Sequence, residues 1–376
     1  AATWIAANKE ALETVTAGVK RARLYVPVVP GETQRMIGLV PVMTRHYRTM
    51  ARLLVSRAML HLGNGNGEAA QRDLLTCHRL ARLVIQGPTL IDRLVGIAIE
   101  GIAMHGEVQL AHSGKLNAQQ AATMRNRLDA LPDLASIADC LDVAERYTFL
   151  DSTLMIAREG TGALAALGDH LPGEKPDLKD VPRSHVEWDE ILRMGNKYYD
   201  RIVLAARKPT FVERMQAVTN LRTEIRRMSE AANDPLVIAN SIFLKGTPPK
   251  RILTRNVGSV LLSLLLPATD GILEADEKSR VVFDLTQVTL ALAQYHAEQG
   301  KYPDQLAELV PECIEKLPRD RFGGRNFHYK RTGDHYRLYS VGANQQDEQG
   351  NGIFTNPLDG DDLAITTLKE PESEPK

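Results

Sequence analysis

The chain has little of three things that often reveal function: cysteine, aromatic side chains and an excess of one charge. Its three cysteines, Cys77, Cys140 and Cys313, form no CxxC pair, which excludes a zinc ribbon and a thioredoxin-type redox motif. Aromatic residues make up 5% of the 376 residues, which argues against a surface that stacks bases. The 46 Lys and Arg residues almost balance the 47 Asp and Glu residues, so the net charge of −1 gives no reason to expect nucleic acid as a partner.

Long apolar runs and the common catalytic motifs are also missing. The most apolar stretch, residues 257–266, is too short to span a bilayer. No GxSxG sequence frames a nucleophilic serine, and neither GxGxxG nor a P-loop marks a nucleotide site. Hydrophobic residues at 43% and charged residues at 25% are nevertheless ordinary for folded proteins, so the composition predicts a globular chain with a substantial core.

Residues 1–245 show the three- and four-residue spacing of apolar side chains that is typical of amphipathic helices. The predicted helices are one ending near residue 62 and others over 68–85, 89–111, 118–130, 134–158, 188–206 and 211–232. Short turns rich in Gly, Pro or Asn connect them, which predicts an antiparallel helical array. The stretch NGEAAQRDLLTCHRLAR looks like one unit of a helical-repeat protein, but no fixed period recurs along the chain.

The sequence predicts four regions. Residues 1–245 form the all-helical array, interrupted by a Pro-rich loop at 168–186, and residues 246–256 form a linker marked by Gly246 and two prolines. Residues 257–365 form a smaller α+β module, with a long helix over 273–299 and a hairpin whose strands cover 326–331 and 335–341. Residues 366–376 are expected to be a disordered tail. The fold class is therefore mainly α, with a small antiparallel sheet near the C-terminal end.

Several motifs near the C-terminal end occur in a characteristic order. They are LLLPA at 264–268, YHAEQGKYP at 295–303, LPRDRFGGRNFHY at 317–329, YRLYSVGAN at 336–344 and DGDDLAI at 359–365. In this order they resemble the major pseudopilin of type II secretion systems, a long helix followed by a small antiparallel sheet. The resemblance covers a little over a quarter of the chain and implies a docking or assembly module.

The whole arrangement, including ANKEALETVTAGVKRARLYVP near the start, is similar to large uncharacterised envelope proteins of planctomycete-type bacteria. This resemblance implies a periplasmic or cell-envelope location. It also implies that any membrane attachment is made by an anchor of the full-length precursor, outside these 376 residues. Other envelope proteins, or further copies of the same chain, are the partners that it implies.

The pseudopilin resemblance also implies a calcium site. In pseudopilins the loop after the YSxGxDG motif binds calcium, and the matching positions in this chain are Asn344, Asp347, Asp361 and Asp362. Calcium takes six to eight oxygen ligands from carboxylates, carbonyls and water, which a flexible acidic loop can supply. A solvated acidic loop without metal is the alternative. The DxDxDG spacing of an EF-hand is absent.

A second set of candidates lies in the helical region. Glu100 stands in the apolar run LVGIAIEGIAM, where a charge needs a partner such as Arg82, Arg93 or Arg146. His105 and His112 are seven residues apart and could ligate a transition metal, although no HExxH spacing supports this. A polar cleft in the helical region could contain Glu100, His105, Glu145, Arg146 and Asp151.

These observations favour a non-enzymatic extracytoplasmic protein with a structural or protein-interaction role. The alternative is a small-molecule-binding protein or a hydrolase that uses the polar cleft. An enzyme would bring several of the five cleft residues within hydrogen-bond reach in one pocket, whereas a binding scaffold would expose a large apolar or charged groove without convergent titratable groups.

Overall fold

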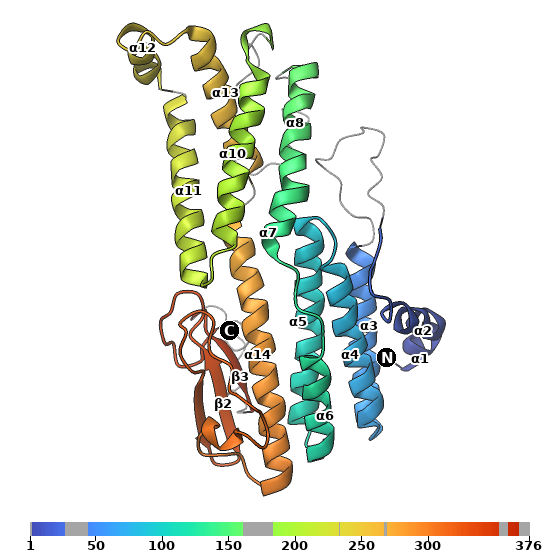
Figure 1. Ribbon diagram of the computed structural model, residues 1–376. Helices are drawn as coiled ribbons and strands as arrows, with labels where there is room; N and C mark the ends of the chain where they lie inside the picture. The colour runs from blue at the N-terminus through green and yellow to red at the C-terminus, as the bar shows by residue number, and fades with distance from the viewer. Residues whose placement is uncertain are drawn as a thin grey trace, which may run out of the picture.

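The computed structural model describes residues 2–26, 44–160, 183–232, 234–266, 269–352 and 360–367. The molecule is 68% helical, and within the described residues one sheet forms, three antiparallel strands in the order β1-β2-β3. The prediction of a mainly α protein with a small sheet is therefore confirmed. Figure 1 shows that the long helices run side by side along one axis and that the sheet lies at one end of the molecule, beside α14.

The N-terminal helices form the first layer of the array. They are α1 (Ala2–Ala7), α2 (Lys9–Gly18), α3 (Thr44–Gly63), α4 (Gly67–Val84), α5 (Leu90–His112) and α6 (Ala118–Asp129). Local sequence explains where they begin, because Asn66 accepts a hydrogen bond from the Ala69 N–H at 3.0 Å, and Thr89 and Asn117 each form a capping box. The helices predicted over 68–85, 89–111 and 118–130 are confirmed to within two residues at each end.

The middle of the chain forms a second group of helices. The predicted helix over 134–158 is α7 (Ile137–Cys140), a π-helical turn η1 (Leu141–Glu145) and α8 (Arg146–Glu159). The 3₁₀ turn η3 (Arg183–His185) precedes α10 (Trp188–Ala206) and α11 (Phe211–Ala232), and the bounds of both helices agree with the prediction. Most of the predicted loop at 168–186 lies outside the described residues.

The predicted linker at 246–256 is wrong over most of its length. Helix α12 (Pro235–Phe243) is followed by α13 (Pro249–Leu265), so residues 249–256 are helical. Proline is compatible with the first helical turn, since its missing N–H would have no partner there, and in this chain Pro249 begins a helix. Val257 and Leu261 of α13 belong to the same apolar core as Ile191 and Leu221. Most of the predicted linker therefore lies inside a packed helical bundle.

Helix α14 (Thr269–Gln299) is the longest element and contacts both the helical array and the sheet. Leu290 packs into a core shared with α3, α4 and α6, and Leu285 and Val288 pack into the core under the sheet. The 3₁₀ turn η4 (Leu306–Leu309) follows it. The predicted helix over 273–299 is confirmed, with its start four residues earlier.

The sheet consists of β1 (His328–Thr332), β2 (His335–Ser340) and β3 (Leu363–Thr366). In the β1–β2 hairpin Thr332 pairs with His335, and Gly333 adopts a φ of 59° in the turn, which glycine allows without strain. In the second pairing Leu338 lies opposite Ile365, and both face the core. The predicted hairpin is confirmed. The predicted tail lies outside the described residues from residue 368 onward.

Two stretches are long and apolar enough to cross a membrane by length and composition alone. They are Leu90–His112 and Pro249–Gln299, and 56% and 50% of the apolar 18-residue window in each is buried inside the molecule. Core helices of soluble proteins pass the same test, so these stretches are weak evidence for a span.

Helices α8 and α10 approach closely at Gly195. A Cβ atom at this position would lie 2.0 Å from Cε1 of the fully buried Phe149. We expect Gly195→Ala to lower the free energy of unfolding by about 1–3 kcal/mol, because the core has no room for the methyl group. Gly101→Ala, at an exposed position of α5, is the matched control, since nothing lies within 4 Å of its Cβ position and alanine favours a helix interior. Urea unfolding measures both, and an equal effect of the two substitutions would contradict this packing.

Candidate metal site and buried charge clusters

Three carboxylates meet where β2 ends and β3 begins. Glu348, Asp361 and Asp362 offer oxygen atoms that all lie within 4.8 Å of one another. Asp362 immediately precedes β3 and is fully buried, whereas Glu348 and Asp361 are half-buried. We call these three residues the carboxylate cluster.

Backbone N–H groups hold two of these carboxylates in place. Asp361 Oδ2 accepts from Ala343 N at 2.9 Å and from Asn344 N at 3.1 Å. Asp362 Oδ2 accepts from Glu348 N at 3.1 Å and from Gly350 N at 2.8 Å. The second oxygen of each, Oδ1, is buried and has no hydrogen-bond partner among the described residues. A buried carboxylate oxygen without a partner is unfavourable, and a cation is one way to satisfy it.

The charges of the carboxylate cluster are crowded. Burial raises the pKa of Asp362 to about 7. The Gly350 N–H lowers this pKa, whereas a hydrogen bond with the Glu348 side chain and the negative charges of Glu348 and Asp347 raise it. The Asn344 amide donates to Glu348 Oε1 at 2.6 Å and holds the pKa of Glu348 below its usual range. The ligand atoms are all carboxylate oxygens, which suit a hard divalent cation such as Ca²⁺ rather than a thiolate- or imidazole-binding metal.

Two glycines allow the backbone to close around this site. Gly342 has a φ of 66°, and a Cβ atom there would lie 2.4 Å from the carbonyl oxygen of Asp361. A Cβ atom on Gly352 would lie 2.1 Å from the carbonyl oxygen of Asp362. Side chains at either position would therefore push the two aspartates out of place.

The structure brings together two of the four predicted calcium ligands, Asp361 and Asp362. Asn344 is adjacent, but its Nδ2 donates to Glu348 and its Oδ1 accepts from Gln346 N at 2.6 Å. It therefore positions Glu348.

The fourth predicted ligand, Asp347, lies to one side of the cluster. Its Oδ1 accepts from Tyr339 Oη at 3.1 Å and from Gln349 N at 2.9 Å, and its Oδ2 is 3.6 Å from Nδ1 of His328. Glu348 completes the cluster and was not predicted. The only signal for it was a second acidic residue directly after Asp347, and sequence alone cannot tell which of two neighbours faces inward.

The residues of the predicted polar cleft make separate contacts. His105 is exposed, Glu145 accepts from Leu90 N at 3.3 Å, and Asp151 is half-buried on α8. Arg146 donates to Asp142 at 2.6 Å and to Asp200 at 2.8 Å. Among the described residues, Glu100, His105, Glu145 and Arg146 form no hydrogen bond or ion pair with one another.

Glu100 belongs to a buried charge cluster that the sequence did not reveal in full. Its Oε1 lies 2.9 Å from Nε of Arg82, which confirms one of the predicted partners. Its Oε2 contacts Nδ1 of His78, whose Nε2 lies 3.0 Å from Oε1 of Glu107. His78 and Arg82 are one turn apart on α4, and the two glutamates are two turns apart on α5. Phe283 of α14 covers the group, with its ring 6.1 Å from the His78 ring.

This His78 cluster, formed by His78, Arg82, Glu100 and Glu107, is electrically balanced when the imidazole is protonated. Burial alone lowers the pKa of His78, but the charges of Glu107 and Glu100 and the hydrogen bonds to both raise it to about 10. The predicted pairing of His105 with His112 as metal ligands is not formed, because His105 is exposed and Nε2 of His112 lies 2.8 Å from Oη of Tyr336.

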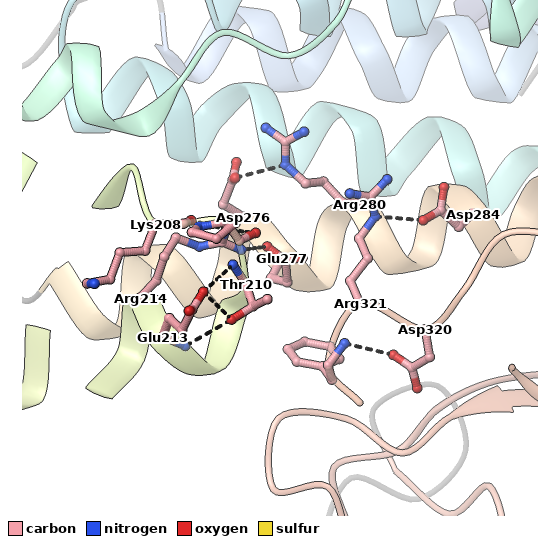
Figure 2. Close-up of polar contacts among 12 residues, drawn as sticks. Lys208, Thr210, Glu213, Arg214, Asp276, Glu277, Arg280, Asp284, Asp320 and Arg321 are labelled. Carbon is pink, nitrogen blue, oxygen red and sulfur yellow. Dashed lines mark hydrogen bonds and ion pairs between the residues drawn. The ribbon is translucent and has the colours of Figure 1, made fainter. Parts of the chain in front are cut away.

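A row of acidic side chains along α14 forms ion pairs with three other parts of the chain, and Figure 2 shows those made to Arg214 of α11 and to Arg321 before β1. Asp276 receives the guanidinium of the fully buried Arg93 from α5, and Arg280 contacts the same carboxylate at 3.0 Å. About two turns beyond Asp276, Asp284 contacts Nε of Arg321 at 2.7 Å. Asp320, next to Arg321, is buried and accepts from the N–H of Phe322 at 3.0 Å. These pairs fix the segment before β1 onto α14.

The same row also fixes the start of α11. Glu277 forms an ion pair with Arg214, whose Nη1 donates to the carbonyl oxygens of Lys208 at 3.1 Å and Pro209 at 3.2 Å. Glu213 accepts from Thr210 and so caps the first turn of the helix (Figure 2). The charged groups at this junction are therefore used to connect elements to α14.

Comparison with protein-family models, with curated proteins and with solved structures gave no match.

Proposed function

We propose that this chain is a non-enzymatic extracytoplasmic protein with a structural or protein-interaction role, whose C-terminal pseudopilin-like module binds calcium. Its partners are other envelope proteins or further copies of the same chain. The carboxylate cluster is the observation that carries the proposal, because three carboxylates converge and two of their buried oxygens have no partner among the described residues. A bound divalent cation would compensate both the crowded charge and the unpartnered oxygens.

The position of the cluster supports a docking role for the module. The carboxylates join the end of β2 to the start of β3, so a cation there would hold the edge of the sheet and its adjoining loop in one conformation. Extracellular calcium is abundant enough to occupy sites of millimolar affinity, whereas cytosolic calcium is not. A module that is ordered by calcium would thus be competent to dock outside the cytoplasm.

The distribution of the other charged groups supports a scaffold rather than an enzyme. Buried Arg93, His78 and Glu100 are each held in ion pairs between helices. Among the described residues, Glu100, His105, Glu145 and Arg146 of the alternative polar cleft form no hydrogen bond or ion pair with one another.

Thermal melting in EDTA and in added calcium tests the proposal. At a calcium concentration of about 100 times the dissociation constant, binding to the folded state raises the free energy of unfolding by about 2.7 kcal/mol. We expect Asp362→Asn to abolish this gain. The same variant should be at least as stable as the wild type in EDTA, because it removes one of three crowded negative charges.

Asp347→Ala is the matched control, since Asp347 belongs to the same loop but its carboxylate faces Tyr339. It should keep the calcium-dependent gain, and Asp361→Ala should lose it. A melting temperature of the wild type that does not respond to millimolar calcium would refute the metal site. A calcium-dependent rise in melting temperature that persists in Asp362→Asn would show that calcium binds at another site.

A further inference from the structure

Helix α12 exposes an unusual concentration of large apolar side chains. None of its residues is buried, and Leu236, Phe243 and Leu244 are 79%, 83% and 82% exposed. Leu236 and Phe243 are two turns apart, so these side chains project from one side of the helix. Asp234 caps its first turn through the Leu236 N–H at 2.8 Å, so the helix has a defined start.

The position of α12 makes this apolar surface a protrusion. The helix lies between the ends of α11 and α13, at the opposite end of the molecule from the sheet (Figure 1). Its inner side, with Val237, Ile238 and Ser241, lines a cleft of about 1220 Å³ between α10, α11 and α13. Leu236, Phe243 and Leu244 are not among the residues that line this cleft, and their high exposure shows that they face solvent.

Basic side chains outnumber acidic ones around α12, because six Lys or Arg residues line the adjacent cleft together with Glu190 and Glu224, and Asp234 precedes the helix. From residue 235 to residue 269 the chain has four basic residues, Lys245, Lys250, Arg251 and Arg255, and no acidic residue. Lys250 and Arg251 pair with Glu187 and Glu190, at 3.3 and 4.0 Å. Lys245 and Arg255 line the cleft together with Arg227 from α11, and none of these three forms an ion pair with a described residue.

We propose that this end of the molecule binds the surface of a membrane that contains anionic lipids. The apolar side of α12 enters the boundary between head groups and acyl chains, and the basic side chains around it contact lipid phosphates. An exposed apolar helix face flanked by Lys and Arg is the usual composition of helices that lie in this interface. An apolar groove would favour a protein ligand, whereas exposed apolar side chains on a helix at the end of the molecule favour a soft apolar phase. This contact is made by the chain itself and does not depend on the calcium site.

Flotation of the full chain with vesicles tests the proposal. We expect binding to phosphatidylcholine vesicles that contain phosphatidylglycerol and much weaker binding to phosphatidylcholine alone. Leu236→Glu combined with Phe243→Glu should reduce binding at least tenfold, because two apolar side chains can no longer enter the interface. Lys245→Gln and Arg255→Gln should each reduce binding to anionic vesicles about fivefold and leave the folded state intact.

Leu204→Glu is the matched control. Leu204 is also exposed, at 66%, but it lies roughly 20 Å further along α10 than Glu190 and so away from α12. It should leave vesicle binding unchanged. In a conservative variant, Phe243→Trp, brominated lipids should quench the new tryptophan, which locates the contact at α12.

Three results would overturn the proposal. They are failure of the full chain to float with anionic vesicles, equal losses in the Leu204→Glu and α12 variants, and no quenching of the tryptophan at position 243. Self-association that is lost in the α12 variants while vesicles have no effect would show instead that the tip binds a second copy of the chain.

Discussion

The substitution His78→Leu is expected to lower the free energy of unfolding by about 3–5 kcal/mol, because it leaves two buried carboxylates without their shared cation. His78 is fully buried between Glu100 and Glu107, and Arg82 reaches only the first of them. One oxygen of Glu107 has no hydrogen-bond partner among the described residues even with histidine present. Urea unfolding at neutral pH measures the loss.

The matched control is His105→Leu on α5. His105 is exposed and one helical turn from the same cluster, so its replacement should change stability by less than about 0.5 kcal/mol. Similar losses for the two variants would show that helix α5 responds to any substitution there and that the His78 cluster has no special role.

The same cluster predicts a pH dependence with a defined sign. The pKa of His78 is raised to about 10 in the folded chain, above the ordinary value of about 6.5 for an unfolded histidine. Its contribution to stability is therefore fully present below about pH 6.5 and is lost as the pH rises through 10. The difference in stability between the wild type and His78→Leu should shrink over this window, and a constant difference would refute the protonated imidazole.

A second large effect is expected for Arg93→Met, about 3 kcal/mol of lost stability. Arg93 is fully buried, forms an ion pair with Asp276 and donates to the Ala135 carbonyl at 2.5 Å. Removing the guanidinium leaves Asp276 buried with Arg280 as its remaining partner. The loss of stability reports how strongly this ion pair connects α5 to α14, two helices that are far apart in the sequence.

A double-mutant cycle separates the ion pair from the loss of volume. Arg93→Met combined with Asp276→Met should cost less than the sum of the single substitutions, because no uncompensated charge remains. Urea unfolding of the four proteins gives the coupling energy. Additive losses would show that Arg93 stabilises the fold through packing alone.

Helix positions could largely be predicted because their signals are local. The apolar spacing and caps of α4, α5 and α6 lie within the helices themselves, and α10 and α11 were predicted with their observed bounds. The linker was mispredicted for a physical reason, because Pro248 and Pro249 are equally suited to a break and to the start of a helix. Nothing in the sequence around residues 141–145 distinguishes a π-helical turn from an α-helical one.

The charge clusters could be predicted only in part because their partners are distant in the sequence. Glu100 was recognised as a charge in an apolar run, and Arg82 was one of three possible partners. His78 was missed because it has no local motif and acquires its role only when α4 packs against α5. Arg93 and Asp276 are separated by 183 positions, and only the tertiary fold brings them together.

The carboxylate cluster could likewise be predicted only in part. Asp361 and Asp362 were predicted from their place in a motif, but the choice between Asp347 and Glu348 depends on how the loop turns after β2. Tyr339 and Gln349 bind Asp347, and this leaves Glu348 beside the two aspartates. The calcium itself stays a prediction.

Calorimetric titration of calcium into the metal-free chain tests the central proposal most directly. We expect one calcium per chain, binding that is lost in Asp362→Asn, and binding that is retained in Asp347→Ala. Absence of binding by the wild type at millimolar calcium, or equal binding by the wild type and Asp362→Asn, would contradict it.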